Sequence, residues 1–275
     1  MRRIGVFYNP LSESSQRQAE ELATWLCHQG LDIWHGVSQE ARDNPAAFMN
    51  MDLLVALGGD GTFLRATRPG IMYHIPVLPI AMGHLSFMAE IGPAEMYQSL
   101  TLLLEGGGWH DRRTLIDVAL YRHGQTLADF TVLNEVVLSR GDISRIVTVE
   151  VQIDDIPLTT YRADGVLVAT ATGSTAYALS AGGPIVDPRS RALVLVAIAA
   201  HLTAVPSMVL HEDTVVTLRL RSHHHAVLSV DGHDNLSLDQ GDEIQVRRSE
   251  QTCVFARVQP SSQFYAGLVP RLRRE

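Results

Sequence analysis

The run Leu57-Gly58-Gly59-Asp60-Gly61-Thr62-Phe63-Leu64 directly follows residues 51–56, a short apolar stretch that is typical of a buried strand. Three glycines within four positions give the backbone conformational freedom and remove the Cβ atoms that would keep a ligand at a distance. Residues 63–67 favour a helix, which the pair Pro69-Gly70 is expected to stop. A strand, a glycine turn and a helix start together point free N–H groups at an anion such as phosphate.

Asp60 stands in the middle of this turn. A loop that only cradled phosphate would gain nothing from a negative charge, so Asp60 indicates a base for a hydroxyl group or a metal ligand. An ordinary strand-to-helix turn is the competing interpretation, because Gly-Gly-Asp-Gly is also good turn chemistry. The run is not a Walker A loop, since no Gly-Lys-Ser/Thr follows it, and it does not match G-x-G-x-x-G.

Composition narrows the classes of protein that fit. The chain has 275 residues and a formal charge of −8, which argues against nucleic acid as the main partner. An anionic ligand must therefore be held by a local basic cluster. Cys27 and Cys253 match no metal spacing and are expected to be reduced thiols of a cytoplasmic protein. The longest apolar run, residues 192–200, is about half of what a membrane span needs, so no membrane partner is expected.

The first part of the chain alternates strand-like and helix-like segments. Residues 4–8, 31–34, 51–57 and 75–80 favour strands, whereas 14–29 and 95–105 have the apolar spacing of helices. Gly30 and the run 106–108 are expected to end those helices. This order predicts an α/β domain with a parallel sheet over residues 1–112. The tail 260–275 is a candidate to return to this domain and complete it.

After about Arg112 the pattern changes to strands without helical spacers. Turns at His123-Gly124, Asp154-Asp155 and Asp231-Gly232 separate many of them. Residues 113–259 are therefore predicted to form an all-β, sandwich-like antiparallel domain. Residues 174–180 are expected to form a helical insertion, and residues 189–200 are a candidate for a second one. The expected strands are 114–121, 126–138, 146–153, 165–170, 214–220, 226–230, 243–249 and 252–258.

A second informative run covers residues 162–184. It has an apolar strand, 166–170, followed by a hydroxyl-rich turn and a short helix that Thr172 or Ser174 could cap. Small side chains, hydroxyl donors, the ring of Tyr177 and the carboxylate of Asp164 would suit a nucleoside, which offers a flat base and ribose hydroxyls. Simple helix capping with small-residue packing is the alternative, because caps use the same residue types.

The pair Asn134-Glu135 lies within the strand-like run 126–138. Neighbouring residues of a regular strand point to opposite faces, so both could reach one ligand only at a bulge or a strand end. A carboxylate can accept from both hydroxyls of a vicinal diol, and an amide can both donate and accept. An Asn-Glu pair taken alone is weak evidence.

The three runs together resemble the NAD kinase family in their order and approximate spacing, from Ile4 to about Phe264. The glycine signature is similar to that of lipid kinases and phosphofructokinases as well, but those families lack the run at 172–184. Gly83-His84-Leu85-Ser86-Phe87 resembles the family's Gly-x-Leu-Gly-Phe segment, and Asp231-Gly232-His233 stands where the family has Asp-Gly-Gln.

The resemblance implies transfer of a phosphoryl group to the 2′-hydroxyl of the adenosine ribose of NAD, giving NADP. ATP or polyphosphate would be the donor, with Mg²⁺ or another divalent cation, and the protein would be a dimer or tetramer. Asp60 would be the base near the 2′-hydroxyl, and Asp164 would meet the nicotinamide end, across a subunit contact. The donor phosphates would lie on Gly58, Gly59, Gly61 and Thr62. The residues implied in NAD binding are Gly61, Arg65, Asn134, Glu135, Arg145, Arg162, Asp164, Thr172, Thr175, Ala176, Tyr177, Ala178, Leu179, Ser180 and His233.

Four positions depart from the family pattern. Ser86 replaces a glycine, so a backbone that needed a positive φ there would be strained. Ala163 and Ala171 replace a usual glycine and a common proline, and His233 in place of Gln makes its contact dependent on pH. None removes a group that the chemistry requires. A lipid-alcohol kinase and a non-catalytic dinucleotide sensor remain the alternative functions.

Overall fold

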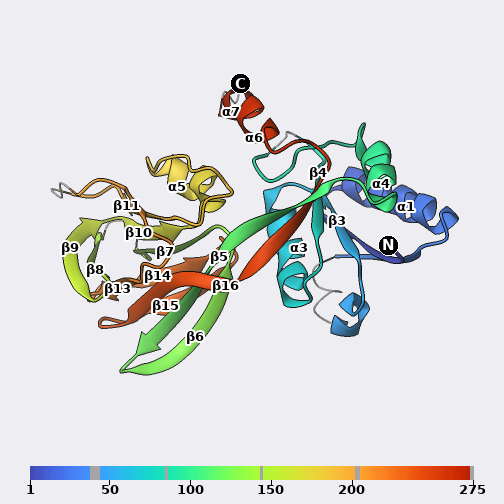
Figure 1. The fold of residues 1–275 in the computed structure, drawn as a ribbon. Helices are drawn as coiled ribbons and strands as arrows, with labels where there is room; N and C mark the ends of the chain where they lie inside the picture. The colour runs from blue at the N-terminus through green and yellow to red at the C-terminus, as the bar shows by residue number, and fades with distance from the viewer. Residues whose placement is uncertain (38–43, 84–85, 143–144, 202–204, 273–275) are drawn as a thin grey trace. The chain divides into compact units, whose positions relative to one another are not determined.

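The computed structural model describes residues 1–37, 44–83, 86–142, 145–201 and 205–272. The chain divides into two compact units, Met1–Arg112 with Cys253–Glu275 (unit 1) and Arg113–Thr252 (unit 2). Two long strands, β5 (Trp109–Arg122) and β16 (Glu243–Arg257), contribute residues to both units (Figure 1).

Unit 1 is built on a parallel sheet. Its strands lie in the order β2-β1-β3-β4, and the last residues of β16 join beside β4, where Phe255 pairs with Val77. β3 and β4 are buried along their whole length, as expected for central parallel strands that are covered on both faces. The strands are β1 (Arg3–Tyr8), β2 (Asp32–Gly36), β3 (Leu53–Gly58) and β4 (Val77–Ala81).

The helices of unit 1 follow the predicted pattern. In α1 the Ser12 hydroxyl accepts the N–H of Ser15 at the first turn, and Gly30, with φ +79°, follows the last. Leu22 and Leu26 of α1 are fully buried in the core of this unit. The helices are α1 (Glu13–His28), η1 (Pro45–Phe48), α3 (Asp60–Met72), α4 (Met96–Leu104), α6 (Gln263–Ala266) and α7 (Leu268–Leu272).

The helix stop predicted at Pro69-Gly70 is wrong, because α3 continues through Pro69 to Met72. A proline inside a helix removes one N–H donor and crowds the carbonyl four residues earlier. Here the last turn is closed by the N–H of Tyr73, which donates to the Pro69 carbonyl at 2.9 Å. Gly70 packs tightly on β4, since a Cβ added there would lie 2.9 Å from Val77 Cγ2. Tertiary packing therefore holds a turn that local propensity disfavours.

The strand order places a ligand site at one edge of this sheet. The chain leaves β1 toward β2 on one side and returns to β3 on the other, which makes a switch point between β1 and β3. Ligands of open α/β sheets bind beyond the carboxyl ends of the strands at such a point. The carboxyl end of β3 leads into Gly58 and Gly59, the glycine turn singled out from the sequence.

Unit 2 contains two β-sheets. In the first, β8 pairs with β9 and β13, β13 pairs with β16, and β5 pairs with β6, all antiparallel. The second sheet has the order β12-β11-β10-β7-β14-β15, antiparallel throughout. The strands are β6 (Gln125–Val132), β7 (Glu135–Arg140), β8 (Val147–Ile153), β9 (Ile156–Ala163), β10 (Gly165–Ala169), β11 (Leu193–Ile198), β12 (Met208–Leu210), β13 (Val216–Leu220), β14 (Ala226–Val230) and β15 (Asp234–Leu238).

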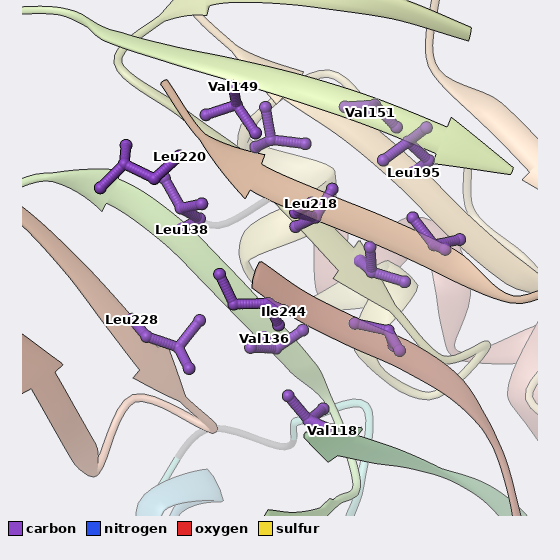
Figure 2. Close-up of a cluster of buried hydrophobic side chains, with 14 of the residues drawn as sticks. Val118, Val136, Leu138, Val149, Val151, Leu195, Leu218, Leu220, Leu228 and Ile244 are labelled. Atoms are coloured by element: carbon purple, nitrogen blue, oxygen red, sulfur yellow. The ribbon is translucent and has the colours of Figure 1, made fainter. Parts of the chain in front are cut away.

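One apolar core joins the two sheets of unit 2. Figure 2 shows Leu218 and Ile244 from the first sheet and Val136 and Leu228 from the second, all buried in the same cluster. Alternate residues of these strands face the core, as the period of two in a strand requires. The predicted fold class, an α/β domain with a parallel sheet and an all-β sandwich-like domain, is confirmed.

Several predicted element limits are wrong. The run 126–138 is two strands, because the chain breaks its pairing at Leu133-Asn134. Residues 189–200 contain the strand β11 rather than a helix, since all-round apolar character also suits a strand buried between neighbours. Strands β9, β12 and β15 were not predicted, and the predicted strands 243–249 and 252–258 form the single strand β16. The short helical insertion is confirmed as η2 (Gly173–Thr175) and α5 (Tyr177–Ser180).

The predicted turns are confirmed by their backbone angles. His123-Gly124, Asp154-Asp155 and Asp231-Gly232 all have positive φ at both residues, as two-residue hairpin loops favour. Ser86 does not have a positive φ, so the strain expected from a missing glycine is absent. His84 and Leu85 of the same segment lie outside the described residues. Among the described residues, no helix is long and apolar enough to cross a membrane.

Candidate active site

The glycine turn of unit 1 is shaped by close backbone packing. A Cβ added to Gly58 would collide with the side chain of Thr62, so only glycine fits there. Gly59 is the N-cap of α3, and its carbonyl accepts the N–H groups of Thr62 at 2.8 Å and Phe63 at 3.1 Å. Asp60 is the first residue of the helix, where its carboxylate meets the positive end of the helix dipole. The turn therefore presents one carboxylate beside a helix N-terminus.

Arg65 lies one helical turn beyond Asp60 and folds back over the turn. Its Nη1 would lie 3.7 Å from a Cβ added to Gly61, and its Nη2 makes a long 3.5 Å contact with Thr62 Oγ1. Burial and the charge of Arg68 lower the pKa of Arg65, but an arginine stays protonated. The structure thus brings a cation to the glycine turn, next to the helix N-terminus that suits an anion.

In unit 2 the pair Asn134-Glu135 lies where the chain passes from β6 to β7. The carboxylate of Asp231, in the turn between β14 and β15, accepts three consecutive backbone N–H groups there. The distances are 3.0 Å from Leu133, 2.8 Å from Asn134 and 3.2 Å from Glu135. These bonds hold the chain out of regular strand pairing. Asp231 was missed as a site residue, although its place in the predicted Asp-Gly turn was the available signal.

The turn after β10 packs directly on the same backbone. The Thr170 hydroxyl donates to the Leu133 carbonyl at 2.6 Å, and the Thr170 N–H donates to the Asn134 carbonyl at 2.8 Å. A Cβ added to Gly173 would collide with the backbone of Asn134, so glycine is required at this approach. The structure therefore brings together the Asn-Glu pair and the 170–180 run, which the family resemblance implied for one ligand.

Asn134 and Glu135 each bury an acceptor without a partner. Among the described residues, Asn134 Oδ1 and Glu135 Oε2 make no hydrogen bond, although the two residues are only 4% and 8% exposed. Burial and the nearby charge of Asp231 raise the pKa of Glu135 to about 8, and the bond from the Tyr177 N–H partly opposes this. An unpaired buried acceptor is costly, so these two atoms indicate a ligand that donates hydrogen bonds to them.

The hydroxyls of the 172–180 run do not cap its helices as predicted. Neither η2 nor α5 has a side-chain cap, because Ser174 instead donates to the Ala171 carbonyl and accepts the N–H of Val186. The Thr175 hydroxyl donates to the Thr172 carbonyl at 3.1 Å. Thr172 accepts at 3.3 Å from Arg113, a buried arginine that sequence reasoning missed.

The short helix α5 divides its residues between the core and the surface. The methyl group of Ala178 is buried in a small apolar cluster under β10 and β11, so only its backbone is available to a ligand. Tyr177 and Ser180 are exposed. Thr175, Ala176 and Leu179 are half-buried. Tyr177, which is 44% exposed, is the aromatic face that the sequence predicted.

His233 turns toward its own hairpin. Its Nδ1 lies 2.6 Å from the Asp231 carbonyl, and since a carbonyl only accepts, Nδ1 carries the proton in that bond. The expected ligand contact of His233 would then be made by Nε2. His233 thus lies in the same turn that clamps the Asn-Glu pair.

Three predicted residues lie at the other end of β10 from this cluster. Asp164 precedes β10 and forms an ion pair with Arg140, with 3.1 Å between Arg140 Nε and Asp164 Oδ1. Arg162 is on the edge strand β9, and Arg145 is on the surface. The ends of the five-residue strand β10 are roughly 15 Å apart at about 3.3 Å per residue. Within one chain, Asp164, Arg162 and Arg145 therefore do not join the Asn134-Glu135 cluster.

The described residues contain no group of three or more His, Cys, Asp and Glu side chains that could hold a metal ion by themselves. This excludes, for that part of the chain, a dedicated protein cage such as a structural zinc site. Magnesium in phosphoryl-transfer sites usually needs only one or two carboxylates, because substrate phosphates supply the other ligands. Asp60 fits that requirement.

Comparison with known proteins agrees with the two-unit architecture. A model described as the ATP-NAD kinase N-terminal domain matches residues 40–108, and one described as the ATP-NAD kinase C-terminal domain matches residues 133–258. The chain is 63% identical over 274 residues to an NAD kinase from Chloroflexus aggregans, covering 100% of this chain and 99% of that protein. It is 36% identical to an NAD kinase from Dehalococcoides mccartyi, covering 99% and 96%.

Two solved structures share the fold. Yeast NADH kinase complexed with NADH has a TM-score of 0.88 at 24% identity, covering 99% of this chain and 87% of that one. An NAD kinase from Archaeoglobus fulgidus in complex with ATP has a TM-score of 0.77 at 23% identity, covering 98% of both chains. The fold and the sequence matches point to the same class, the dinucleotide kinases. The chain belongs to the NAD kinase family.

The raised pKa of Glu135 predicts how stability depends on pH. Between pH 4.5 and about 8 the folded protein keeps a proton that the unfolded chain has lost, so stability falls as pH rises through this range. Glu135→Gln does not titrate, so its stability relative to wild type should rise by roughly 1.4 kcal/mol per pH unit there. Urea unfolding of both proteins at several pH values measures this difference in the free energy of unfolding. A flat difference between Glu135→Gln and wild type across this range would contradict the assignment.

The three backbone hydrogen bonds that Asp231 accepts, which we call the Asp231 clamp, give a second prediction. Asp231→Asn replaces one carboxylate oxygen by a donor that faces backbone N–H groups, so unfolding free energy should fall by about 1–3 kcal/mol. Removing the charge should also lower the pKa of Glu135, because Asp231 contributes to its rise. Chemical denaturation and NMR titration measure the two effects. Asp155→Asn is the matched control, since Asp155 also has a positive φ in a hairpin turn, and an equal loss in both variants would count against the clamp.

Proposed function

We infer that this chain is an NAD kinase, and we propose that it transfers a phosphoryl group to the 2′-hydroxyl of the adenosine ribose. Family membership over the whole chain supports the activity. The observation that carries the site assignment is the pair of buried unpaired acceptors, Asn134 Oδ1 and Glu135 Oε2. A ribose diol and a base edge donate the hydrogen bonds that these two atoms lack.

Unit 2 holds the dinucleotide in this proposal. Glu135 would accept from ribose hydroxyls, and Asn134 would meet the base edge or the adjoining sugar. The backbone N–H groups and hydroxyls of Thr172 and Thr175–Ser180, with the ring of Tyr177 and the imidazole of His233, would line the rest. Because Asp231 and Gly173 hold this backbone rigidly, the dinucleotide meets a preformed surface, which lowers the entropy cost of positioning the reacting hydroxyl.

Unit 1 receives the phosphoryl donor in this proposal. The N–H groups at Gly59 and Gly61, the side chain of Thr62 and the guanidinium of Arg65 would bind the phosphates of ATP, or of polyphosphate, at the start of α3. Gly58 permits the close approach of the Thr62 side chain. Mg²⁺ or another divalent cation, held by the donor's phosphate oxygens, would neutralise charge on the transferred group. Charge neutralisation and alignment are the main demands of phosphoryl transfer.

Asp60 is the proposed base. A carboxylate is a far weaker base than an alkoxide, so the proton leaves the 2′-oxygen late, after its bond to phosphorus has begun to form. The O–P bond to the ribose forms as the bond to the donor's leaving oxygen breaks, and the proton goes to Asp60. Cys27 and Cys253 form no disulfide, which fits a cytoplasmic location.

The test is NADP formation from NAD, ATP and Mg²⁺ by wild type and by Asp60→Asn. We expect Asp60→Asn to keep the fold and NAD binding while turnover falls at least about a hundredfold, the scale of a lost general base. Asp129→Asn, at an exposed position on β6, is the control and should keep full turnover. More than about a tenth of wild-type turnover in Asp60→Asn would reject the base assignment. Absence of NADP with wild type would favour a lipid-alcohol kinase or a dinucleotide sensor.

Self-association into a dimer or tetramer is a separate proposal. Asp164, Arg162 and Arg145 lie away from the Asn134-Glu135 cluster within one chain, so we propose that a second copy supplies Asp164 to the nicotinamide end of the dinucleotide. Mixing Asp164→Ala with Asp60→Asn, each inactive alone, should restore part of the activity in hybrid oligomers. Sedimentation with activity measured in parallel is the check, and a fully active monomer would exclude a shared site.

A further inference from the structure

The C-terminal helix α7 brings an arginine to unit 1 that the function described so far does not use. Arg271 Nη2 donates to the Ala89 carbonyl at 3.1 Å, and its guanidinium lies 5.9 Å from the centre of the Phe87 ring. The helices α6 and α7 form the end of the described chain (Figure 1). Arg271 therefore lies against the segment 86–90, which follows β4.

Other groups already hold this segment. Arg257 Nη1 donates to the Met88 carbonyl at 2.7 Å, and Arg257 Nε pairs with Asp111 at 3.1 Å in a fully buried ion pair. Glu90 Oε1 accepts the N–H groups of Val258 and Gln259 at 2.8 Å and 3.1 Å. With these bonds in place, the single bond from Arg271 to Ala89 is not needed to fix the segment.

The charge of Arg271 interacts with the charge of Asp60 in the glycine turn. Burial lowers the pKa of Arg271, whereas the charges of Glu90 and Asp60 raise it, so Asp60 lies within electrostatic range of the guanidinium. Arg271 Nε is buried and, among the described residues, makes no hydrogen bond. A half-buried arginine with an unused donor is costly to keep unless it serves a ligand.

The guanidinium of Arg271 packs against Gly267. A Cβ added to Gly267 would lie 2.8 Å from Arg271 Nη1 and 2.9 Å from Cζ, closer than these atoms can approach. The φ of Gly267 is −86°, so its backbone does not itself require glycine. An alanine at this position would therefore displace the guanidinium of Arg271.

We propose that Arg271 is a phosphate-binding residue that contacts the terminal phosphates of the phosphoryl donor at the glycine turn. This rests on the proposed function of that turn as the donor site. A guanidinium offers paired N–H donors that match phosphate oxygens. Together with Arg65 it would supply the local positive charge that an acidic chain needs to hold a triphosphate. The C-terminal segment is thereby part of the donor site.

Three variants test the proposal on the full chain. Arg271→Ala should raise KM for ATP, and Kd for inorganic tripolyphosphate by calorimetry, about tenfold or more, while KM for NAD stays within about twofold. Arg271→Lys should recover part of the loss, because it keeps the charge without the fork. Gly267→Ala keeps the arginine but displaces it, so its effect on both constants should be smaller and of the same kind. Arg17→Ala removes an exposed cation of α1 and should change neither constant.

The outcomes separate this proposal from the function on which it rests. Unchanged ATP KM and tripolyphosphate binding in Arg271→Ala would overturn it, and so would equal changes in both KM values with a lowered Tm, which indicate a structural latch. If Arg271→Ala does not fold, Gly267→Ala and Arg271→Lys decide by the same two constants. Failure of the proposed function would appear instead as no NADP from wild type, and tripolyphosphate binding would still report on Arg271.

Discussion

Unit 2 of this protein depends on one carboxylate that accepts three consecutive backbone N–H groups. Asp231 takes the N–H donors of Leu133, Asn134 and Glu135, which would otherwise pair with a neighbouring strand. Regular pairing would point Asn134 and Glu135 to opposite faces of the sheet. Because Asp231 satisfies the backbone outside the strand ladder, the chain can break between β6 and β7 and present both side chains at one place.

This arrangement has an electrostatic consequence. The charge that anchors the backbone also raises the pKa of Glu135, together with burial, so the free protein holds a neutral carboxyl group where an ordinary glutamate would be charged. Buried acceptors on Asn134 and Glu135 remain unpaired among the described residues. Preorganisation for the ligand is therefore maintained at a cost to folding stability, as is common at functional sites.

Unit 1 follows from a different constraint, the topology of a parallel sheet. The strand order makes a switch point between β1 and β3, and only glycine at Gly58 allows α3 to begin so close to β3. Asp60 is negative at a turn that we propose to receive anions, so cations have to come from elsewhere. Arg65 comes from the same helix, and Arg271 from the far end of the chain.

The sequence by itself determined the fold class, the glycine turn, the Asn-Glu pair, the 172–180 run and the hairpin turns, because each is encoded by local patterns of apolar spacing, glycine and turn residues. Local patterns did not reveal that Pro69 stays within α3 or that residues 189–200 contain a strand. Nor did they point to Asp231, Arg113 or Arg271. These depend on contacts between residues far apart in the chain, such as the Asp231 carboxylate with the Asn134 N–H, and only the tertiary structure decides which distant groups meet.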